Sequence, residues 1–399
     1  MYEVVLIDAL RSPIGSFQGG LSSVRADDLA AHAMSSLIER TGLDPSLVDD
    51  VFFGCANQAG EDNRNVARMA LLLAGFPHTV PGVTLNRLCA SGLEAVNQAA
   101  RAAACGDGSV YVAGGVESMS RAPYVFARGT VAPKAGNLVG FDTSLGWRFP
   151  NKQMEALFPL EAMGCTAENL VDQYAISRED QDAYALRSHQ KALHAWDQGW
   201  FDAEVVPVPI PQRRGDPVLV SRDEGPRAGS TMEKLGRLRA AFRAGGSVTA
   251  GNSSTLNDGS SAVLVTTRAR ALELGLKPRF RVVAKAAAGV DPTRMGIGPV
   301  PATQKALALA GWKLEDLDAV ELNEAFAAQS LAVLRALGLD EARVNLHGGA
   351  IALGHPLGCS GARILTTLMG ALDRTGGDRG LATLCVGVGQ GVATLIERV

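Results

Sequence analysis

Cys89 is the residue whose type and position most clearly suggest chemistry, because it directly precedes an Ala-rich stretch of helical composition from about residue 90 to 105. The first N–H groups of a helix lack partners within the helix and form the positive end of its dipole, which favours a thiolate. A free cysteine has a pKa near ~8.5, and such a setting lowers it to roughly 3.5–7.5. The position therefore predicts a nucleophile. The alternative is a small buried side chain, which is the usual fate of a free cysteine.

Two further candidates lie in glycine-rich turns near the C-terminal end. His355 stands between Gly354 and Pro356, and Cys385 ends an apolar strand that is followed by alternating glycines. Imidazole titrates near neutrality, so His355 is a candidate base for the Cys89 thiol. Two thiols and an imidazole on three turns suit a nucleophile, its base and a separate proton carrier. Taken singly, His355 would be a turn histidine that bonds backbone, and Cys385 a core cysteine.

Composition narrows the class of protein. A chain of 399 residues suggests two or three domains, and an apolar share of 47% indicates a well-buried globular protein. The net charge of -3 gives no general attraction to nucleic acid or to an anionic membrane, so we expect neither as a partner. Any recognition of phosphate must therefore be local.

Cysteine usage and the start of the chain indicate where the protein works. The six cysteines form no C-x-x-C pair and no dense secreted pattern, so we expect reduced thiols in a cytoplasmic protein. Residues 1–8 have the pattern of a first strand and not of a signal peptide, and no stretch is long and uncharged enough to span a bilayer. Four histidines have no metal-ligand spacing, so no metal is expected: His32, His78, His189 and His194.

The elements that must position these residues alternate along the chain. Apolar runs at 51–53, 110–113 and 319–322 alternate with Ala- and Leu-rich helical stretches, which predicts an α/β chain with largely parallel sheets. Residues 42–51 are similar to residues 311–320, each after a helix and before a strand. This internal repeat predicts two similar α/β halves whose strand ends face a shared site.

The pattern is interrupted between residues 120 and 247. Clustered Pro, Gly, Arg and Asp accompany an isolated helical stretch near 178–184. Such an insertion is too long for a plain loop, so we expect a small separate domain or lid. The N-terminal half then comprises residues 1–119 and 248–269, and the C-terminal half residues 270–399.

Taken together, these segments resemble the thiolase family, the acyl-CoA C-acyltransferases. The resemblance rests on four motifs in the same order, at residues 86–92, 323–326, 348–358 and 381–391, and extends over nearly the whole chain. It implies a duplicated, five-layered α-β-α-β-α fold whose inserted loop domain covers coenzyme A. It also implies a homodimer or homotetramer that uses acyl-CoA and CoA as substrates, with no permanently bound cofactor.

The resemblance further implies reversible cleavage of a 3-oxoacyl-CoA. Cys89 attacks the 3-oxo carbon, acetyl-CoA leaves, and CoA removes the acyl group in a ping-pong cycle. His355 accepts the Cys89 proton, and Cys385 protonates the departing enolate. Asn323, through a water, and His355 stabilise the enolate oxygen, while the N–H groups of Cys89 and Gly387 stabilise the tetrahedral oxyanion. From its position alone, Asn323 is also a candidate helix N-cap.

The family's coenzyme A contacts correspond to particular residues of this chain. Arg227 matches a position near the adenosine phosphates, although a solvated surface arginine is the alternative. The positions of the pantetheine channel are Ala241, Phe242, Ala250, Gly251, Ser254, Met163 and Phe326.

Departures from the family pattern bear on the acyl chain. Ala162 stands where thiolases specialised for acetoacetyl-CoA commonly carry histidine, which points away from that substrate, and His347 stands where the family usually has asparagine. Residues 53–68 and 146–149 resemble those thiolases that act on 3-oxoadipyl-CoA. Arg148 is then a candidate partner of the distal carboxylate, with a structural arginine as the alternative.

Other functions stay open on the sequence. Thiolases acting on acetoacetyl-CoA or in fatty-acid β-oxidation are the alternatives within the family. A decarboxylating condensing enzyme shares the duplicated architecture but typically lacks a second cysteine, so Cys385 argues against it. An inactive acyl-CoA-binding homologue would have lost Cys89, His355 or Cys385, all of which are present.

Overall fold

The structure is a computed structural model that describes residues 1–128 and 137–399. Ten of its strands form one sheet in the order β12-β13-β14-β11-β1-β10-β5-β3-β4, with β2 (Gly15–Ser16) paired to β10. The N-terminal half supplies β1 (Val4–Arg11), β3 (Asp50–Gly54), β4 (Gly82–Leu85), β5 (Val110–Ser118) and β10 (Asn257–Thr267). The C-terminal half supplies β11 (Phe280–Gly289), β12 (Ala319–Leu322), β13 (Arg379–Val386) and β14 (Gln390–Arg398).

The two halves join through a short contact between β1 and β11. Only Val5 and Leu6 pair across it, with Arg281 and Phe280. Within the halves, β3 pairs in parallel with β4 and β5, and β12 with β13, but the other pairs are antiparallel. The expectation of largely parallel sheets is therefore wrong. One reason is that β14 returns from β13 through the tight turn 387–389, where a parallel neighbour would need a long crossover.

Three clusters of buried apolar side chains lie between helices and strands, and together they define the five expected layers. Helices α1 (Ala26–Thr41) and α2 (Val66–Leu73) cover the outer face of the N-terminal strands. Helices α9 (Pro299–Ala310) and α10 (Ala327–Leu337) cover the outer face of the C-terminal strands. Between the two sets of strands, α3 (Ser91–Cys105) packs against α12 (Leu357–Thr375). The duplicated α-β-α-β-α architecture is confirmed.

The internal repeat is visible in the local structure. Helix α1 ends at Gly42 (φ 64°), a short 3-10 helix (Pro45–Leu47) follows, and β3 begins. Helix α9 likewise ends at Gly311 (φ 68°) and leads through a 3-10 helix (Leu314–Asp316) into β12. Glycine adopts this left-handed conformation at a helix end without steric cost, which explains its place in both copies.

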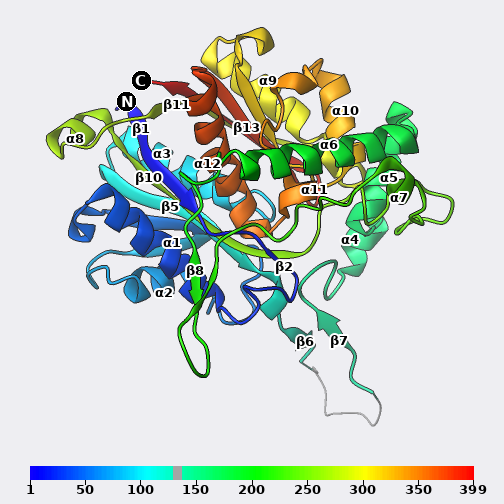
Figure 1. Cartoon of the computed structure of the whole chain (residues 1–399), viewed down its shortest axis with the longest axis horizontal. Helices are drawn as coiled ribbons and strands as arrows, with labels where there is room; N and C mark the ends of the chain where they lie inside the picture. Colours follow the sequence, from blue (N-terminus) through cyan, green and yellow to red (C-terminus); the bar gives the residue numbers. More distant parts are fainter. Residues whose placement is uncertain (129–136) are drawn as a thin grey trace.

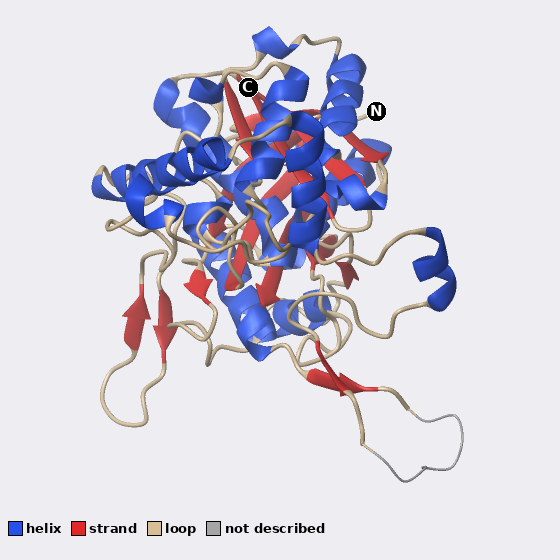
Figure 2. Ribbon diagram, turned by 90° about the vertical axis from the view of Figure 1, so that its right-hand side faces the viewer, coloured by secondary structure: helices blue, strands red, loops and turns tan. Residues whose placement is uncertain are grey.

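Between β5 and β10 the chain leaves the sheet. It forms α4 (Lys152–Leu157), α5 (Met163–Tyr174), α6 (Arg178–Asp197) and α7 (Met232–Gly236), and the hairpins β6 (Tyr124–Phe126) with β7 (Gly140–Asp142) and β8 (Val208–Ile210) with β9 (Val218–Val220). Both hairpins project from the body of the molecule (Figures 1 and 2). Helix α6 lies against α10 and α11 (Ala350–Leu353), and α8 (Arg268–Glu273) connects β10 to β11. None of the helices in the described ranges is long and apolar enough to cross a membrane.

Candidate active site

Cys89 lies in a strained turn between β4 and α3. Leu88, directly before it, has φ 46°, a left-handed conformation that is uncommon for a residue with a side chain. The Leu88 N–H donates to Asn86 Oδ1 at 2.9 Å, and the Ser91 hydroxyl donates to the Leu88 carbonyl at 2.6 Å. Helix α3 begins at Ser91 with Ala90 as its N-cap, so the expected helix start directly after Cys89 is confirmed to within a residue.

The charge state of the Cys89 thiol differs from the sequence-based expectation. Burial raises its pKa to about 11, although the N–H groups of Gly387 and of Cys89 itself oppose this rise. The expectation of a lowered pKa is wrong, because the sulfur loses more hydration than these N–H groups and the helix end replace. The thiol is therefore protonated near neutral pH, and it would need a base to act as a nucleophile.

His355 is held uncharged in the turn between α11 and α12. Its Nδ1 lies 2.6 Å from the Ser360 hydroxyl, which donates its hydrogen to the Pro356 carbonyl at 2.9 Å. Because a hydroxyl has one hydrogen, Nδ1–H must donate to Ser360, which leaves a lone pair on Nε2. Burial lowers the pKa of His355 to about 3, so the ring is uncharged and can accept a proton.

The starts of α3 and α12 touch, which brings the Cys89 and His355 turns together. A methyl group at Gly92 would lie 2.7 Å from the Gly358 carbonyl oxygen and 3.2 Å from the Ala362 side chain. Only a residue without a side chain permits this approach. The sequence pattern of two glycine-containing helix starts thus places a thiol and an imidazole at one end of the central layer.

The tautomer assignment predicts the effect of Ser360→Ala. Without the hydroxyl, Nδ1–H loses its acceptor, so the tautomer with a free Nε2 is no longer favoured. A lost hydrogen bond of about 1–1.5 kcal/mol corresponds to a roughly five- to tenfold fall in kcat/KM for 3-oxoacyl-CoA cleavage. Ser261→Ala is the matched control, because the Ser261 hydroxyl is equally buried and bonds the Leu10 carbonyl and the Thr366 hydroxyl but not the His355 ring. Equal activity of the Ser360 variant and this control would contradict the assignment.

Cys385 is the last residue but one of β13 and is 1% exposed. Burial, with a contribution from the nearby Cys89, raises its pKa far above the usual range of a thiol. In the following turn, Val388 has φ 64°, and a methyl group at Gly387 would lie 3.2 Å from Leu88 Cδ1. The Gly387 backbone therefore lies beside the Cys89 turn. A neutral thiol in this position can donate a proton without carrying charge at rest.

Asn323 follows β12 and faces His355. Its Nδ2 lies 3.5 Å from His355 Nε2, while its buried Oδ1 has no hydrogen-bond partner within the described ranges. Helix α10 begins at Ala327 with Phe326 as N-cap, so the alternative of Asn323 as the helix N-cap is wrong. A buried polar atom without a partner is costly, and an amide held this way is suited to bind water or substrate.

The Cys89 turn opens into a cavity of about 270 Å³. Residues 143–148 of the insertion form one wall, and Met163, Gly387 and Val388 form another. Arg148 is half-buried, and its Nη1 donates to the Thr143 carbonyl at 3.3 Å. Among the lining residues that the structure describes, Arg148 is the one cation.

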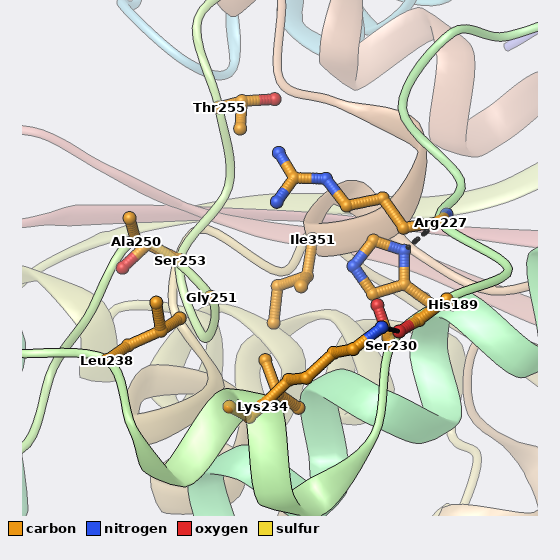
Figure 3. A pocket seen from close by; sticks show the side chains of 12 residues that line it. His189, Arg227, Ser230, Lys234, Leu238, Ala250, Gly251, Ser253, Thr255 and Ile351 are labelled. Carbon is orange, nitrogen blue, oxygen red and sulfur yellow. Dashed lines mark hydrogen bonds between the residues drawn. The ribbon is translucent and has the colours of Figure 1, made fainter.

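Two further cavities, of about 320 and 440 Å³, adjoin each other and share Arg227 and Ala250. The first also contains Gly251, and the second contains Ala241, Phe242 and Ser254. Figure 3 shows the Arg227 side chain extending into the first cavity above His189. Leu145 lines both the second cavity and the cavity at Cys89, so the three hollows follow one another.

The remaining predicted contacts lie near this path. Met163 lines the cavity at Cys89. Phe326 lines none of the three, is 8% exposed, and packs edge-on against Phe242 with ring centroids 5.9 Å apart. The residues predicted to contact the coenzyme thus lie together along the three cavities, except that Phe326 packs behind Phe242 and lines no cavity.

Several lining residues were missed from the sequence. Lys234 lies in the first cavity and donates to the Gly229 carbonyl at 2.7 Å, and His189 accepts the Arg227 N–H at 3.3 Å. Burial and the charge of Arg227 lower the pKa of His189 to about 4. In the sequence, a lysine within a polar insertion has the pattern of a surface residue. The one signal is Thr231, which caps α7 by accepting the Lys234 N–H.

In residues 1–128 and 137–399, no group of three metal-ligating side chains could hold a metal ion.

His347 and Ala162, the two departures from the family pattern, have different surroundings. His347 is buried, its Nε2 accepts from Arg374 Nε at 2.9 Å, and its ring packs near Trp200 with centroids 5.2 Å apart. Ala162 is the N-cap of α5, directly before Met163. The histidine therefore bonds the end of α12, whereas the alanine lies at the edge of the site.

Comparison with known proteins agrees with this geometry. A sequence model of the thiolase N-terminal domain matches residues 4–269, and one of the thiolase C-terminal domain matches residues 276–398. The chain belongs to the thiolase family. It is therefore an acyltransferase of the class that cleaves 3-oxoacyl-CoA, as the four motifs predicted.

Individual thiolases are similar over their full length. A beta-ketoadipyl-CoA thiolase of Pseudomonas aeruginosa is 55% identical over 100% of this chain and 99% of that protein. A 3-oxoadipyl-CoA/3-oxo-5,6-dehydrosuberyl-CoA thiolase of Escherichia coli K12 is 52% identical over 100% of both chains. Among solved structures, the Bacillus anthracis acetyl-CoA acetyltransferase is 46% identical with a TM-score of 0.94, covering 100% of this chain and 99% of that one.

Proposed function

We propose that this thiolase cleaves 3-oxoadipyl-CoA with CoA, giving acetyl-CoA and the CoA thioester of a four-carbon dicarboxylic acid. The observation that carries the proposal is the position of Arg148 in the same cavity as Cys89. Two of the similar thiolases named above are called after this substrate, and they are 55% and 52% identical to this chain.

The surroundings of Arg148 favour a ligand carboxylate. Within the described ranges no carboxylate forms an ion pair with its guanidinium, whereas Arg121 and Arg87 are paired with Glu61 and Glu94. The guanidinium is anchored through one nitrogen to the Thr143 carbonyl, which leaves its other N–H groups for a carboxylate. A distal carboxylate would thus find a fixed, planar donor next to the reacting thiol.

In the proposed first half-reaction, His355 Nε2 takes the Cys89 proton while the sulfur attacks the 3-oxo carbon. The N–H groups of Cys89 and Gly387, which already point at the sulfur, stabilise the oxyanion. The bond between the α and β carbons then breaks, and Cys385 protonates the leaving enolate. Asn323 and the newly protonated His355 stabilise the enolate oxygen. In the second half-reaction the Cys385 thiolate takes the proton of the CoA thiol, and the CoA sulfur attacks the acyl group on Cys89. The Cys89 sulfur leaves and takes back its proton from His355.

The coenzyme would follow the three cavities. Arg227 and Lys234 supply local positive charge for its phosphates, and the small residues Ala250, Gly251 and Ser254 border the path toward Cys89. Arg227, Lys234 and Arg148 all belong to residues 120–247. We infer that this insertion is the domain that covers CoA, set between an N-terminal half of residues 1–119 with 248–269 and a C-terminal half of residues 270–399.

Assembly and location are also inferred. Edge strand β4 exposes Val83, and α2 beside it exposes Leu72 and Leu73. An unpaired strand edge with exposed apolar side chains is suited to pair with a second copy, so we infer a homodimer or homotetramer. With no permanently bound cofactor, the protein would act on CoA and acyl-CoA in the cytoplasm.

Arg148→Ala tests the substrate. The variant should lose roughly ten- to a hundredfold in kcat/KM for 3-oxoadipyl-CoA, because a hydrogen bond to a charged group contributes about 1.5–3 kcal/mol. It should keep its kcat/KM for 3-oxohexanoyl-CoA, which has the same chain length but ends in a methyl group. Acetyl-CoA release measures both. Equal loss on the two substrates would make Arg148 structural, and wild-type preference for acetoacetyl-CoA would overturn the dicarboxylate proposal.

A further inference from the structure

Glu117, at the end of β5, is a buried carboxylate that none of the steps above uses. It is 2% exposed and lines the cavity into which Cys89 opens. Its Oε2 accepts the N–H groups of Ala56 at 3.0 Å and Gly358 at 2.7 Å, and its Oε1 accepts the Asn57 N–H at 3.0 Å. Burying a carboxylate costs free energy unless donors compensate for the lost water, and here all the donors come from other segments of the chain. Glu117 therefore connects these segments.

One oxygen of Glu117 reaches the His355 turn. Gly358 is in the first turn of α12, three residues after His355, and this helix has no side-chain cap of its own. The carboxylate satisfies a free N–H there and lies at the positive end of the helix dipole. A methyl group at Gly358 would lie 2.9 Å from Glu117 Oε2, so the approach requires glycine. Glu117 therefore holds the first turn of α12 in place, and with it the turn that carries His355.

The same oxygen reaches the Cys89 turn through two more hydrogen bonds. The Ala56 carbonyl accepts from Asn86 Nδ2 at 2.9 Å, and Asn86 Oδ1 accepts the Leu88 N–H at 2.9 Å. The Leu88 N–H belongs to the strained residue that sets Cys89 in place. The chain of contacts from Glu117 thus ends at the nucleophile.

A third branch reaches the wall of the cavity that carries Arg148. Asn57, held by Glu117 Oε1, donates from Nδ2 to the Thr143 carbonyl at 3.2 Å and to its hydroxyl at 3.0 Å. The Thr143 carbonyl also accepts from Arg148. One carboxylate is therefore connected through hydrogen bonds to the Cys89 turn, to the His355 turn and to the wall of the cavity at Cys89.

We propose that Glu117 is a positioning residue of the thiolase reaction, whose ionised carboxylate holds the Cys89 and His355 turns in register. All its backbone partners are donors, so a protonated carboxyl would set an O–H against an N–H and lose a contact. The proposal rests on the thiolase reaction and not on the identity of the acyl chain.

Titration near neutrality makes this role testable. Burial raises the pKa of Glu117 to about 7, with a smaller contribution from the negative charge of Asp62. The groups that face it are the thiols of Cys55, Cys89 and Cys359, the Asp62 carboxylate, and the Glu61–Arg121 ion pair across an adjoining small cavity. The ionised, active form is present above the Glu117 pKa and is lost as the pH falls through it.

The experiment is a pH profile of a single turnover. Acetyl-CoA release from 3-oxohexanoyl-CoA is measured without added CoA, so that neither the CoA thiol nor a substrate carboxylate titrates. Wild type should lose activity on the acid side with a midpoint near 7. Glu117→Gln should be slower by roughly ten- to a hundredfold and should lack this acid limb, because its amide does not ionise.

The same pH profile measured on Asp62→Asn, which keeps Glu117, is a second test. Removal of the neighbouring negative charge lowers the Glu117 pKa, so the acid limb should move to lower pH. A limb that persists in Glu117→Gln, or that does not move in Asp62→Asn, would overturn the proposal. The wild-type and Asp62→Asn profiles decide the question even if Glu117→Gln folds poorly. Failure of 3-oxoadipyl-CoA as a substrate would leave the proposal intact.

Discussion

Cys89→Ser is expected to reduce 3-oxoacyl-CoA cleavage by roughly ten-thousandfold while the protein stays folded. Burial already raises the pKa of the Cys89 thiol to about 11, and a serine hydroxyl in its place is far harder to deprotonate. His355, with a pKa lowered to about 3, can assist a thiol but not remove a serine proton at a comparable rate. Release of acetyl-CoA measures the loss, and circular dichroism confirms the fold.

Cys105→Ser is the control for this substitution. Cys105 ends the same helix, α3, but is exposed and far along the helix from the cavity, so the variant should keep wild-type activity. Cleavage by Cys89→Ser at a rate near that of the control would show that another group is the nucleophile.

Cys385→Ala is expected to separate the two kinds of chemistry. Carbon–carbon cleavage and exchange of the acetyl-CoA α-protons with solvent should both fall by roughly a thousandfold, since each needs the same acid or base. Acylation of Cys89 by a simple activated thioester should stay within about tenfold of wild type, because no carbon acid is formed. The neutral, buried thiol seen beside Cys89 has the protonation state that this role requires.

The measurement pairs two assays on one enzyme preparation. Deuterium exchange into acetyl-CoA reports proton transfer, and burst acylation reports the nucleophile. Equal loss in both would mean that Cys385 only packs against Cys89 and has no dedicated acid–base role.

The three candidate catalytic residues could be picked out from the sequence because each is marked by its neighbours. Cys89 precedes a helix, and His355 and Cys385 lie in turns where glycines recur, so type and spacing together indicated the site. The repeat of a glycine-ended helix and a strand at Gly42 and Gly311 likewise predicted two halves, and the structure confirms both copies.

Properties that depend on burial could not be predicted. The helix end next to Cys89 suggested a lowered pKa, but the sequence does not show how much water the folded site excludes, and burial reverses the sign. The antiparallel pairing of β1 and β10 was also hidden, because these strands lie more than two hundred residues apart. The contacts of Glu117 could not be predicted either, since its partners come from segments distant in the sequence.

The most direct test is to mix the enzyme with 3-oxoadipyl-CoA in the absence of CoA and to map the adduct by peptide mass spectrometry. We expect one equivalent of acetyl-CoA to be released and a succinyl group, the four-carbon remainder, to be bound as a thioester to Cys89. Added CoA should remove this group as succinyl-CoA. An adduct on Cys385 or no adduct at all, with acetyl-CoA still released, would contradict the assignment of Cys89 as the acyl carrier.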